Sequence, residues 1–232
     1  MSRRSMIMSG IRFFLLIVLC LLVDLGYGQD FTGYIQPTVA LNYKVTPFYS
    51  HNFAINSRNF WFKDEESTLK AKQLDLVHFS NLKIMDNQSV TFGVQYRFRS
   101  FIDSGENELR LTQQYNYTQK PFIVRFGQRF RTEQRITKSN TVHRFRYRFS
   151  VDFPLNGERI DIGEGYLVGN LESLLSIGKH INPEYDQRAT LQLGWLLSNS
   201  IKFQVGTEYR LEDFTDGKAH ILIFISTLNL SL

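Results

Sequence analysis

Residues 122–153 read FIVRFGQRFRTEQRITKSNTVHRFRYRFSVDF and contain two alternating runs that meet at Thr137–Asn140. In each run the aromatic and aliphatic residues share one parity, and the arginines share the other. Successive side chains of a β-strand point to opposite faces, so each run predicts a strand with an apolar face and an arginine-rich face. The 3.6-residue period of a helix would mix the two sets. The stretch therefore predicts a β-hairpin.

The arginine-rich face of this hairpin decides its surroundings. Like charges that face each other across a sheet are destabilising, whereas a watery lumen with the aromatic residues toward lipid suits both faces. A turn closed at Lys138–Ser139 makes the facing pairs Arg131/Arg146, Glu133/Arg144 and Arg125/Asp152. A turn wider by one residue on each strand shifts the partners by two but keeps every charge on the lumen face. Both registers lack enough acids, so acids from other strands must cross the lumen, and parity favours Glu208 and Glu212.

The N-terminal residues predict export. In Met1–Gly28 basic residues precede the short apolar run Phe13–Val23, and small residues then offer a cleavage site, so residues 1–28 are expected to be a cleaved signal peptide. Residues 29–232 are expected to form a single domain. Cys20, the only cysteine, lies inside the signal. Without the signal, 24 of the 27 basic and 21 of the 22 acidic residues remain, a net charge of +3. This modest charge gives no reason to expect nucleic-acid binding.

Further alternating segments separated by polar turns continue to the last residue. They predict an all-β, antiparallel, up-and-down transmembrane β-barrel of about 10–12 strands. Our count is odd, whereas bacterial barrels usually have an even number of strands. We therefore expect either a miscount before Lys63 or a strand hidden in Asn170–Tyr185, which reads as an irregular outward loop with a helical turn at Leu171–Leu175. Arg159–Val168 reads as a strand.

Two stretches carry a resemblance to a known family. They are RFGQRFRTEQRI (125–136) with HRFRYRFSVDFPLNG (143–157), and EYDQRATLQLGWLLSNSIKFQVGTEYR (184–210). The chain resembles the outer-membrane barrels classed as domain of unknown function 2490. The resemblance is best from Val124 to Arg210, and it implies a barrel in the cell outer membrane of a Gram-negative envelope, without implying an activity or catalytic residues.

The parity of the strands places a ladder of charges in the lumen. Its members are Arg125, Arg129, Arg131, Glu133, Arg135, Arg144, Arg146, Arg148, Asp152, Arg188, Glu208, Arg210 and Glu212. The same parity adds the bases Arg97, Arg99, Arg110 and Lys202 and the acids Glu108 and Asp161. Small barrels fill their interiors with side chains, which favours a salt-bridged structural interior. The excess of base favours the alternative, a small porin-like, anion-selective pore or transport channel. A secreted or periplasmic lipocalin-like binding protein is the second alternative.

Catalytic and metal sites have little support in the sequence. The five histidines are scattered and lack metal-ligand spacing. A lipid hydrolase would need Ser, His and an orienting group on the lipid face, and Ser80 and His78 alone share a parity. We therefore expect a non-enzymatic protein without a cofactor. Its expected partners are outer-membrane lipid, a small anionic solute and an envelope protein, which would dock on the projecting hairpin and the loop Asn170–Tyr185.

Overall fold

A computed structural model describes residues 31–179 and 181–232, and the expected signal peptide, residues 1–28, lies outside them. No helix in the described ranges is long and apolar enough to cross a membrane. The described residues form eleven β-strands. The strands are β1 (Phe31–Lys44), β2 (Tyr49–Lys63), β3 (Glu66–Met85), β4 (Gln88–Phe98), β5 (Glu108–Gln119), β6 (Arg125–Ile136), β7 (Thr141–Pro154), β8 (Gly165–Gly178), β9 (Ile181–Ser198), β10 (Ile201–Glu212) and β11 (Ala219–Ser231).

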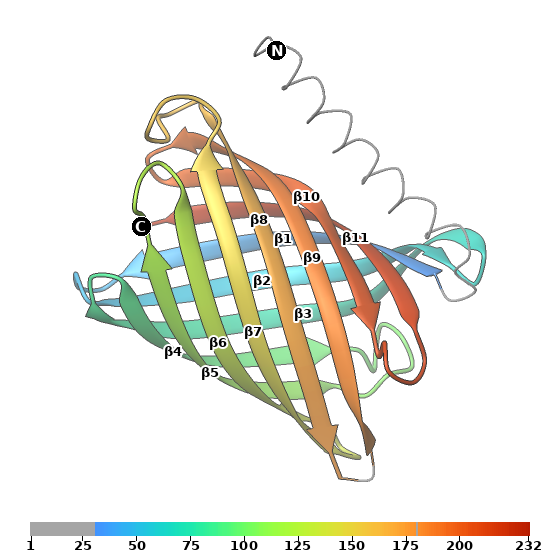
Figure 1. The fold of residues 1–232 in the computed structure, drawn as a ribbon. Helices are drawn as coiled ribbons and strands as arrows, with labels where there is room; N and C mark the ends of the chain where they lie inside the picture. Colours follow the sequence, from blue (N-terminus) through green and yellow to red (C-terminus); the bar gives the residue numbers. More distant parts are fainter. Residues whose placement is uncertain (1–30, 180) are drawn as a thin grey trace, which may run out of the picture.

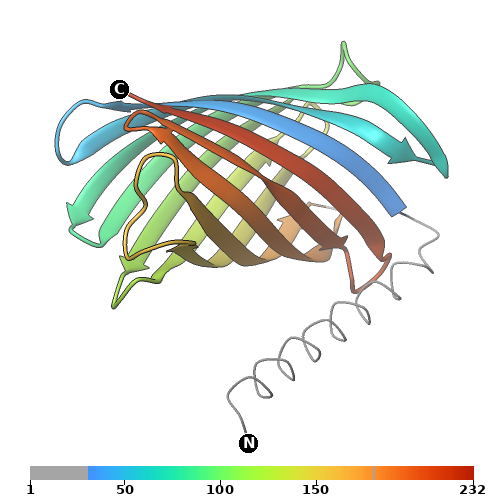
Figure 2. The same cartoon turned by 90° about the horizontal axis from the view of Figure 1, so that it is seen from above.

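These strands close into one barrel, in which each strand pairs with its neighbours in the sequence and β1 pairs with β11 (Figures 1 and 2). All sequential neighbours are antiparallel, but the closing pair is parallel, with Phe31 beside His220 and Asn42 beside Ser231. Because an odd number of alternating strands ends in the direction in which it began, β11 can close on β1 only in parallel. The first and last strands therefore bring residue 31 and the C-terminus to opposite ends of the barrel.

The central hairpin has the tighter of the two registers that the sequence allows. Arg131 faces Arg146, and the pairs Glu133/Arg144 and Arg125/Asp152 also form. The all-β barrel and the closure of this hairpin are thus confirmed. Beyond the turn, Glu106 accepts hydrogen bonds from the Ser139 hydroxyl (2.8 Å) and the Ser139 amide (3.1 Å). These bonds hold the pKa of Glu106 below its usual range and tie the loop after β4 to the hairpin tip.

The alternative of a strand hidden in Asn170–Tyr185 is confirmed, because this stretch contains most of β8 and the start of β9, and the loop with a helical turn expected there is wrong. The expected even number of strands is also wrong, because the parallel seam accommodates eleven. Arg159–Val168 is not a strand of its own, since β8 begins only at Gly165 and the preceding residues form the connection from β7. One misplaced strand and one missed strand cancelled in the count. The expected docking loop at Asn170–Tyr185 is therefore absent.

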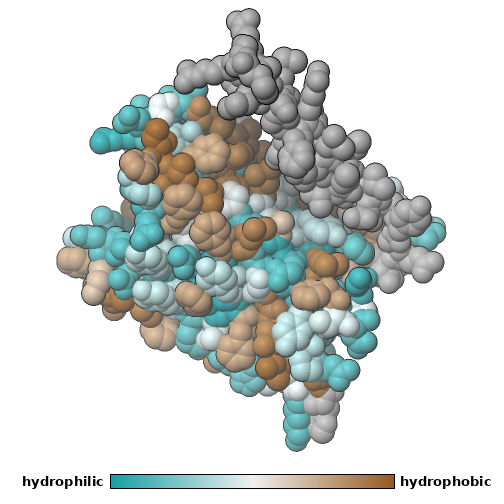
Figure 3. Space-filling view, viewed as in Figure 1, coloured by the Kyte–Doolittle hydropathy of each residue, from teal (hydrophilic) through white to brown (hydrophobic). Residues whose placement is uncertain are grey.

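The two faces of the wall differ in kind. The outer face carries large apolar side chains that are more than half exposed, among them Ile55, Phe92, Phe130, Leu171 and Leu191. Figure 3 shows apolar side chains in patches on one side of the molecule, with polar side chains between them. The buried side chains are mostly polar or charged. A soluble protein buries its apolar residues and exposes its charges, so this distribution is inverted.

A small apolar cluster lies inside the barrel at the parallel seam. Tyr34 of β1, Phe60 of β2, and Ile221 and Ile223 of β11 are all buried there. Phe60 accordingly points inward, while the next residue, Trp61, lies on the outer face over Gly33, where a Cβ atom would come within 2.3 Å of the indole. This arrangement explains why Phe60–Phe62 interrupts the alternation of the sequence.

Candidate functional site: the charged barrel interior

Glu172 of β8 lies at the centre of the interior charges. One of its oxygens is 3.3 Å from Arg129 and 3.0 Å from Arg148, and the other is 2.6 Å from Arg146. The three arginines come from β6 and β7, and only 3% of the Glu172 side chain is exposed. Because a buried charge needs a partner of opposite sign, Glu172 and its arginines hold three neighbouring strands in register.

Two further acids extend this belt of charge around the wall. Glu133 lies 2.9 Å from Arg146 and 3.3 Å from Arg131, so Arg146 bridges Glu133 and Glu172. Glu108 of β5 pairs with Arg110 on its own strand and, at 2.8 Å, with Arg135 on β6. Both acids are almost fully buried. The arginine side chains thus alternate with acids instead of facing one another unscreened.

On the next strand beyond Glu172, Asp186 of β9 lies 3.3 Å from Arg188 and 3.8 Å from Arg144. Arg188 also reaches Glu212 of β10, 3.6 Å away. The belt is completed by the pairs Arg210/Glu208, Arg210/Glu212 and Arg97/Asp75. The last of these is bidentate, with both nitrogen–oxygen distances at 2.7 Å, which is the strongest geometry for an arginine and a carboxylate.

All thirteen residues of the expected ladder take part in ion pairs, but not all in the same place. Arg125 and Asp152 pair at 2.9 Å near the strand ends, where 57% of the Arg125 side chain is exposed. The other members lie in the buried belt. Asp161, expected in the lumen, is instead exposed in the connection between β7 and β8.

The acids that cross to the hairpin differ from the expected ones. Glu208 and Glu212 pair with arginines of β9 and β10, and the acids of other strands that pair with the hairpin arginines are Glu108, Glu172 and Asp186. The sequence does not predict Glu172 as an interior acid, because it lies in the stretch that reads as a loop. It does not predict Asp75 as one either, because the facing of that strand is ambiguous in the sequence. The signal for Asp75 was its position between the outward residues Leu74 and Leu76.

A polar cavity of about 260 Å³ lies inside the barrel next to the belt. Arg58 and Lys72 line it, and no carboxylate of the described residues is within 4.0 Å of either side chain. Arg58 instead donates two hydrogen bonds to Gln36, at 2.7 and 2.9 Å. The Lys72 ammonium lies over the Tyr34 ring, 4.5 Å from its centroid. These contacts compensate the two cations only partly.

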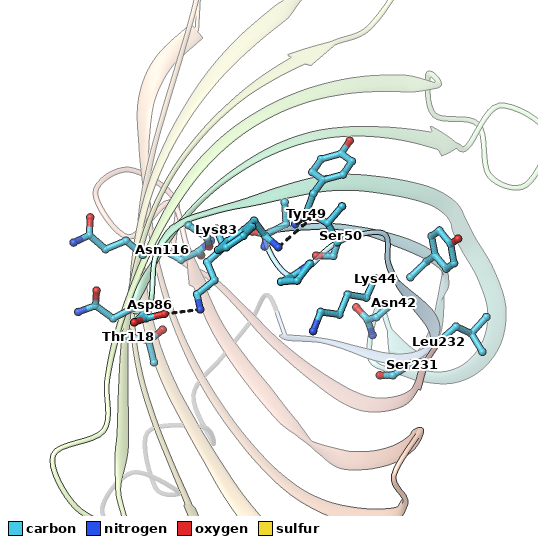
Figure 4. Close-up of a pocket in the computed structure, with 18 residues that line it drawn as sticks. Asn42, Lys44, Tyr49, Ser50, Lys83, Asp86, Asn116, Thr118, Ser231 and Leu232 are labelled. Carbon is cyan, nitrogen blue, oxygen red and sulfur yellow. Dashed lines mark hydrogen bonds and ion pairs between the residues drawn. The ribbon is translucent and has the colours of Figure 1, made fainter.

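The mouth at the end where the C-terminus lies is chemically different. A hollow of about 460 Å³ there is lined largely by uncharged polar side chains such as Asn42, Ser50 and Asn116 (Figure 4). Of its two lysines, Lys44 and Lys83, the second is paired with Asp86 at 2.8 Å. The concentrated positive charge therefore belongs to the belt and not to this mouth. No cluster of three potential metal ligands occurs within residues 31–179 and 181–232.

A closed barrel with an apolar outer face and a belt of paired charges inside defines the class of this protein, a β-barrel with an inverted distribution of polarity. The sequence match is more particular. Residues 37–220 match the family described as "Protein of unknown function (DUF2490)", and the chain belongs to this family. No curated protein matches the chain.

Proposed function

We propose that the protein is an integral barrel of the cell outer membrane whose charged interior is structural. In this proposal the export signal directs the chain to the envelope, the apolar outer face contacts lipid, and the charge belt holds the wall together. The role of this interior is non-enzymatic and accessory to envelope assembly, with an envelope protein as partner. The observation that carries the proposal is the inverted polarity, because exposed Phe92 and Leu171 lie outside while Glu172 and Glu133 are almost fully buried.

The pairing pattern favours a structural interior over an open channel. Glu172 is held by three arginines from β6 and β7, and Glu133 and Glu108 are each held by an arginine of their own strand and one of a neighbouring strand. Side chains locked in such pairs fill a narrow barrel, as in small barrels generally. A lipocalin-like binder, by contrast, would need an apolar interior for its ligand and a polar outer face.

The incompletely compensated cations favour one alternative, a small anion-selective pore. Arg58 and Lys72 have no carboxylate partner among the described residues, and the buried Nε atoms of Arg99, Arg129, Arg146 and Arg188 have no hydrogen-bond partner there, although these four arginines form ion pairs through their other nitrogens. Arginine rings that line a water-filled path select anions. A small anionic solute would then be the natural ligand of the cavity.

Planar-bilayer recording distinguishes a structural interior from an anion-selective pore. A structural interior predicts no steady conductance from the wild type. A steady anion-selective current that is lost in the double variant R129Q/R148Q would refute the structural reading and establish the pore.

Location is tested separately by fractionation. The protein should stay with the membranes after an alkaline wash, and release as soluble material would favour the secreted or periplasmic binder.

A further inference from the structure

A polar cluster interrupts the apolar outer face on β2 and β3. His51 faces Ser80 in the ladder between these strands, and Phe53 faces His78. Phe53 is 47% exposed, so the parity that it shares with His51 points away from the barrel interior. The four side chains therefore lie together on the outer face of the wall, whereas the charge belt lies on the inner face.

The contacts within the cluster join a nucleophile to a base. The Ser80 hydroxyl oxygen lies 3.3 Å from Nδ1 of His51, and Nε2 of His78 lies 3.0 Å from the same nitrogen. The Tyr49 hydroxyl donates a hydrogen bond to the Ser80 oxygen at 3.2 Å. In the tautomer that carries its hydrogen on Nε2, His51 offers the Nδ1 lone pair to the Ser80 hydroxyl. This is the arrangement that activates a serine for attack on an acyl carbon.

The ring of His78 is held in place by stacking. Its centroid is 4.7 Å from that of Phe53 and 5.2 Å from that of His51, with interplanar angles of 21° and 28°. His78 is thus a positioning residue for His51. The sequence reading considered Ser80 and His78 but lacked a base, because His51 lies on another strand.

An apolar groove adjoins the cluster. It has a volume of about 690 Å³, and its lining includes Val39, Ile55, Leu76, Val94 and one polar residue of the cluster, His78. This volume is within the range of about 300–1,000 Å³ that is usual for ligand sites. On a surface that faces lipid, such a groove takes an acyl chain. An acyl chain that runs along the groove has its ester end beside the Ser80 cluster.

A bland interpretation is that Tyr49, His51, His78 and Ser80 only satisfy one another's hydrogen bonds. Polar side chains on a lipid-facing surface are costly, and a self-contained network is one way to reduce that cost. This interpretation explains the hydrogen bonds. It explains neither the pairing of a hydroxyl with an imidazole and a second hydroxyl donor, nor the position of the groove next to them.

We propose that Ser80 and His51 form an outer-face site that cleaves the fatty-acyl esters of membrane lipids. The activity goes beyond the structural role proposed above and replaces the expectation of a non-enzymatic protein. The shared substrate chemistry is a long-chain carboxylic ester, which occurs in glycerophospholipids and in lipopolysaccharide.

The reaction balances without a cofactor. The Ser80 oxygen attacks the ester carbonyl while its proton moves to Nδ1 of His51, which displaces the His78 hydrogen bond, and the Tyr49 hydroxyl donates to the developing oxyanion. The carbon–oxygen bond to the alcohol part then breaks, and the leaving oxygen takes the proton from Nδ1. Water attacks the acyl-serine with His51 as base, and Ser80 regains a proton as the fatty acid leaves. The products are one fatty acid and one lysolipid.

The test uses the full chain in vesicles that carry radiolabelled acyl esters, with one arm of phosphatidylethanolamine and phosphatidylglycerol and one arm of lipopolysaccharide. The wild type should release labelled fatty acid in at least one arm, and that arm identifies the source of the substrate. His51→Ala should slow release by about 10²–10⁴-fold, the usual contribution of a general base. Ser80→Ala should abolish release. Ser173→Ala, a matched change of an exposed serine on the outer face of β8, should leave the rate unchanged.

Three further measurements separate chemistry from folding. A long-chain alkyl fluorophosphonate should form an adduct on Ser80, detected by peptide mass spectrometry, and the adduct should be lost in His51→Ala. Val94→Trp fills the groove and should slow cleavage of long-chain nitrophenyl esters but not of nitrophenyl acetate. His78→Phe preserves the stacking and should lower kcat with little change in KM. Equal release by the wild type and Ser80→Ala, or no release in either arm together with an unmodified Ser80, would overturn the proposal. Either result leaves the bilayer and fractionation tests of the charged interior unaffected.

Discussion

Replacing Glu172 with glutamine should destabilise the barrel more than any other single neutralisation of an interior acid. The substitution preserves the size of the side chain but removes the negative charge that Arg129, Arg146 and Arg148 share. Three guanidinium groups are then left with one fewer counter-charge in a confined space. The amide group of glutamine also has two hydrogen-bond donors that point toward groups which are themselves donors.

The contacts set the size of the effect. At an effective dielectric constant of about 20, two opposite unit charges 4 Å apart attract by about 4 kcal/mol, so the three contacts of Glu172 amount to about 12 kcal/mol before desolvation. Burial of the ions costs several kcal/mol each and offsets most of this sum. Loss of one partner of a buried pair typically costs about 3–5 kcal/mol, which is the loss expected for Glu172→Gln.

Urea unfolding of the protein in lipid vesicles, followed by tryptophan fluorescence and by migration on unheated gels, measures the loss. The matched control is Asp152→Asn, which removes the acid of the Arg125 pair at the strand ends, where Arg125 is 57% exposed. Exposed pairs contribute about 0–1 kcal/mol, so the control should be nearly neutral. If Glu172→Gln lost less than about 1 kcal/mol, or if Asp152→Asn lost as much as Glu172→Gln, the buried belt would not be what stabilises the barrel.

Three further predictions address the wall and its closure. Gly206→Ala should lose about 1–3 kcal/mol through overpacking, because the new Cβ would lie 2.1 Å from the Leu191 carbonyl oxygen, whereas Gly169→Ala, with nothing within 4 Å, should be tolerated in the same urea titration. Phe149→Arg should lose about 2–4 kcal/mol if the site is near the membrane midplane, and Phe149→Leu should not. Single cysteines at Thr32 and Leu232 should react with a membrane-impermeant maleimide from opposite sides of the vesicle, since the parallel seam separates the two ends; labelling from the same side would contradict the seam.

The sequence predicts the central hairpin well because its pattern is long and its turn is short. A two-residue period over many positions fixes the facing of each side chain, and a one-residue slip would put the arginines on the apolar outer face. The pairs Arg131/Arg146 and Glu133/Arg144 follow from that constraint and form as expected. The same reasoning predicts the barrel and the basic residues on the two strands of the central hairpin.

Prediction fails where apolar residues occupy the inner face. In β8 the buried residues are Tyr166, Glu172, Leu174 and Ser176, while Ser173 is exposed, so leucine and serine occur on both faces and the period is lost. The acid at the centre of the belt was missed for this reason. In β2, Phe60 points inward into the seam cluster, beside the inward-facing Arg58. Which strands contribute to a mixed inner face depends on closure of the barrel, which no local pattern encodes.

The position of the apolar cluster has a physical explanation in the topology. The β1–β11 pair joins the segments that are farthest apart in the sequence, so its closure costs more chain entropy than that of any hairpin. Its ladder cannot be guided by a turn, and a parallel pair is slightly less stable per residue than an antiparallel one. Tyr34, Phe60 and Ile223 bury apolar surface at this seam, and this burial stabilises the pairing of β1 with β11. Ion pairs in the same place would make the pairing depend on electrostatic attractions that water and salt screen. The inner wall thus combines two kinds of stabilisation, with ion pairs along the sequential hairpins and apolar packing where the chain meets its own beginning.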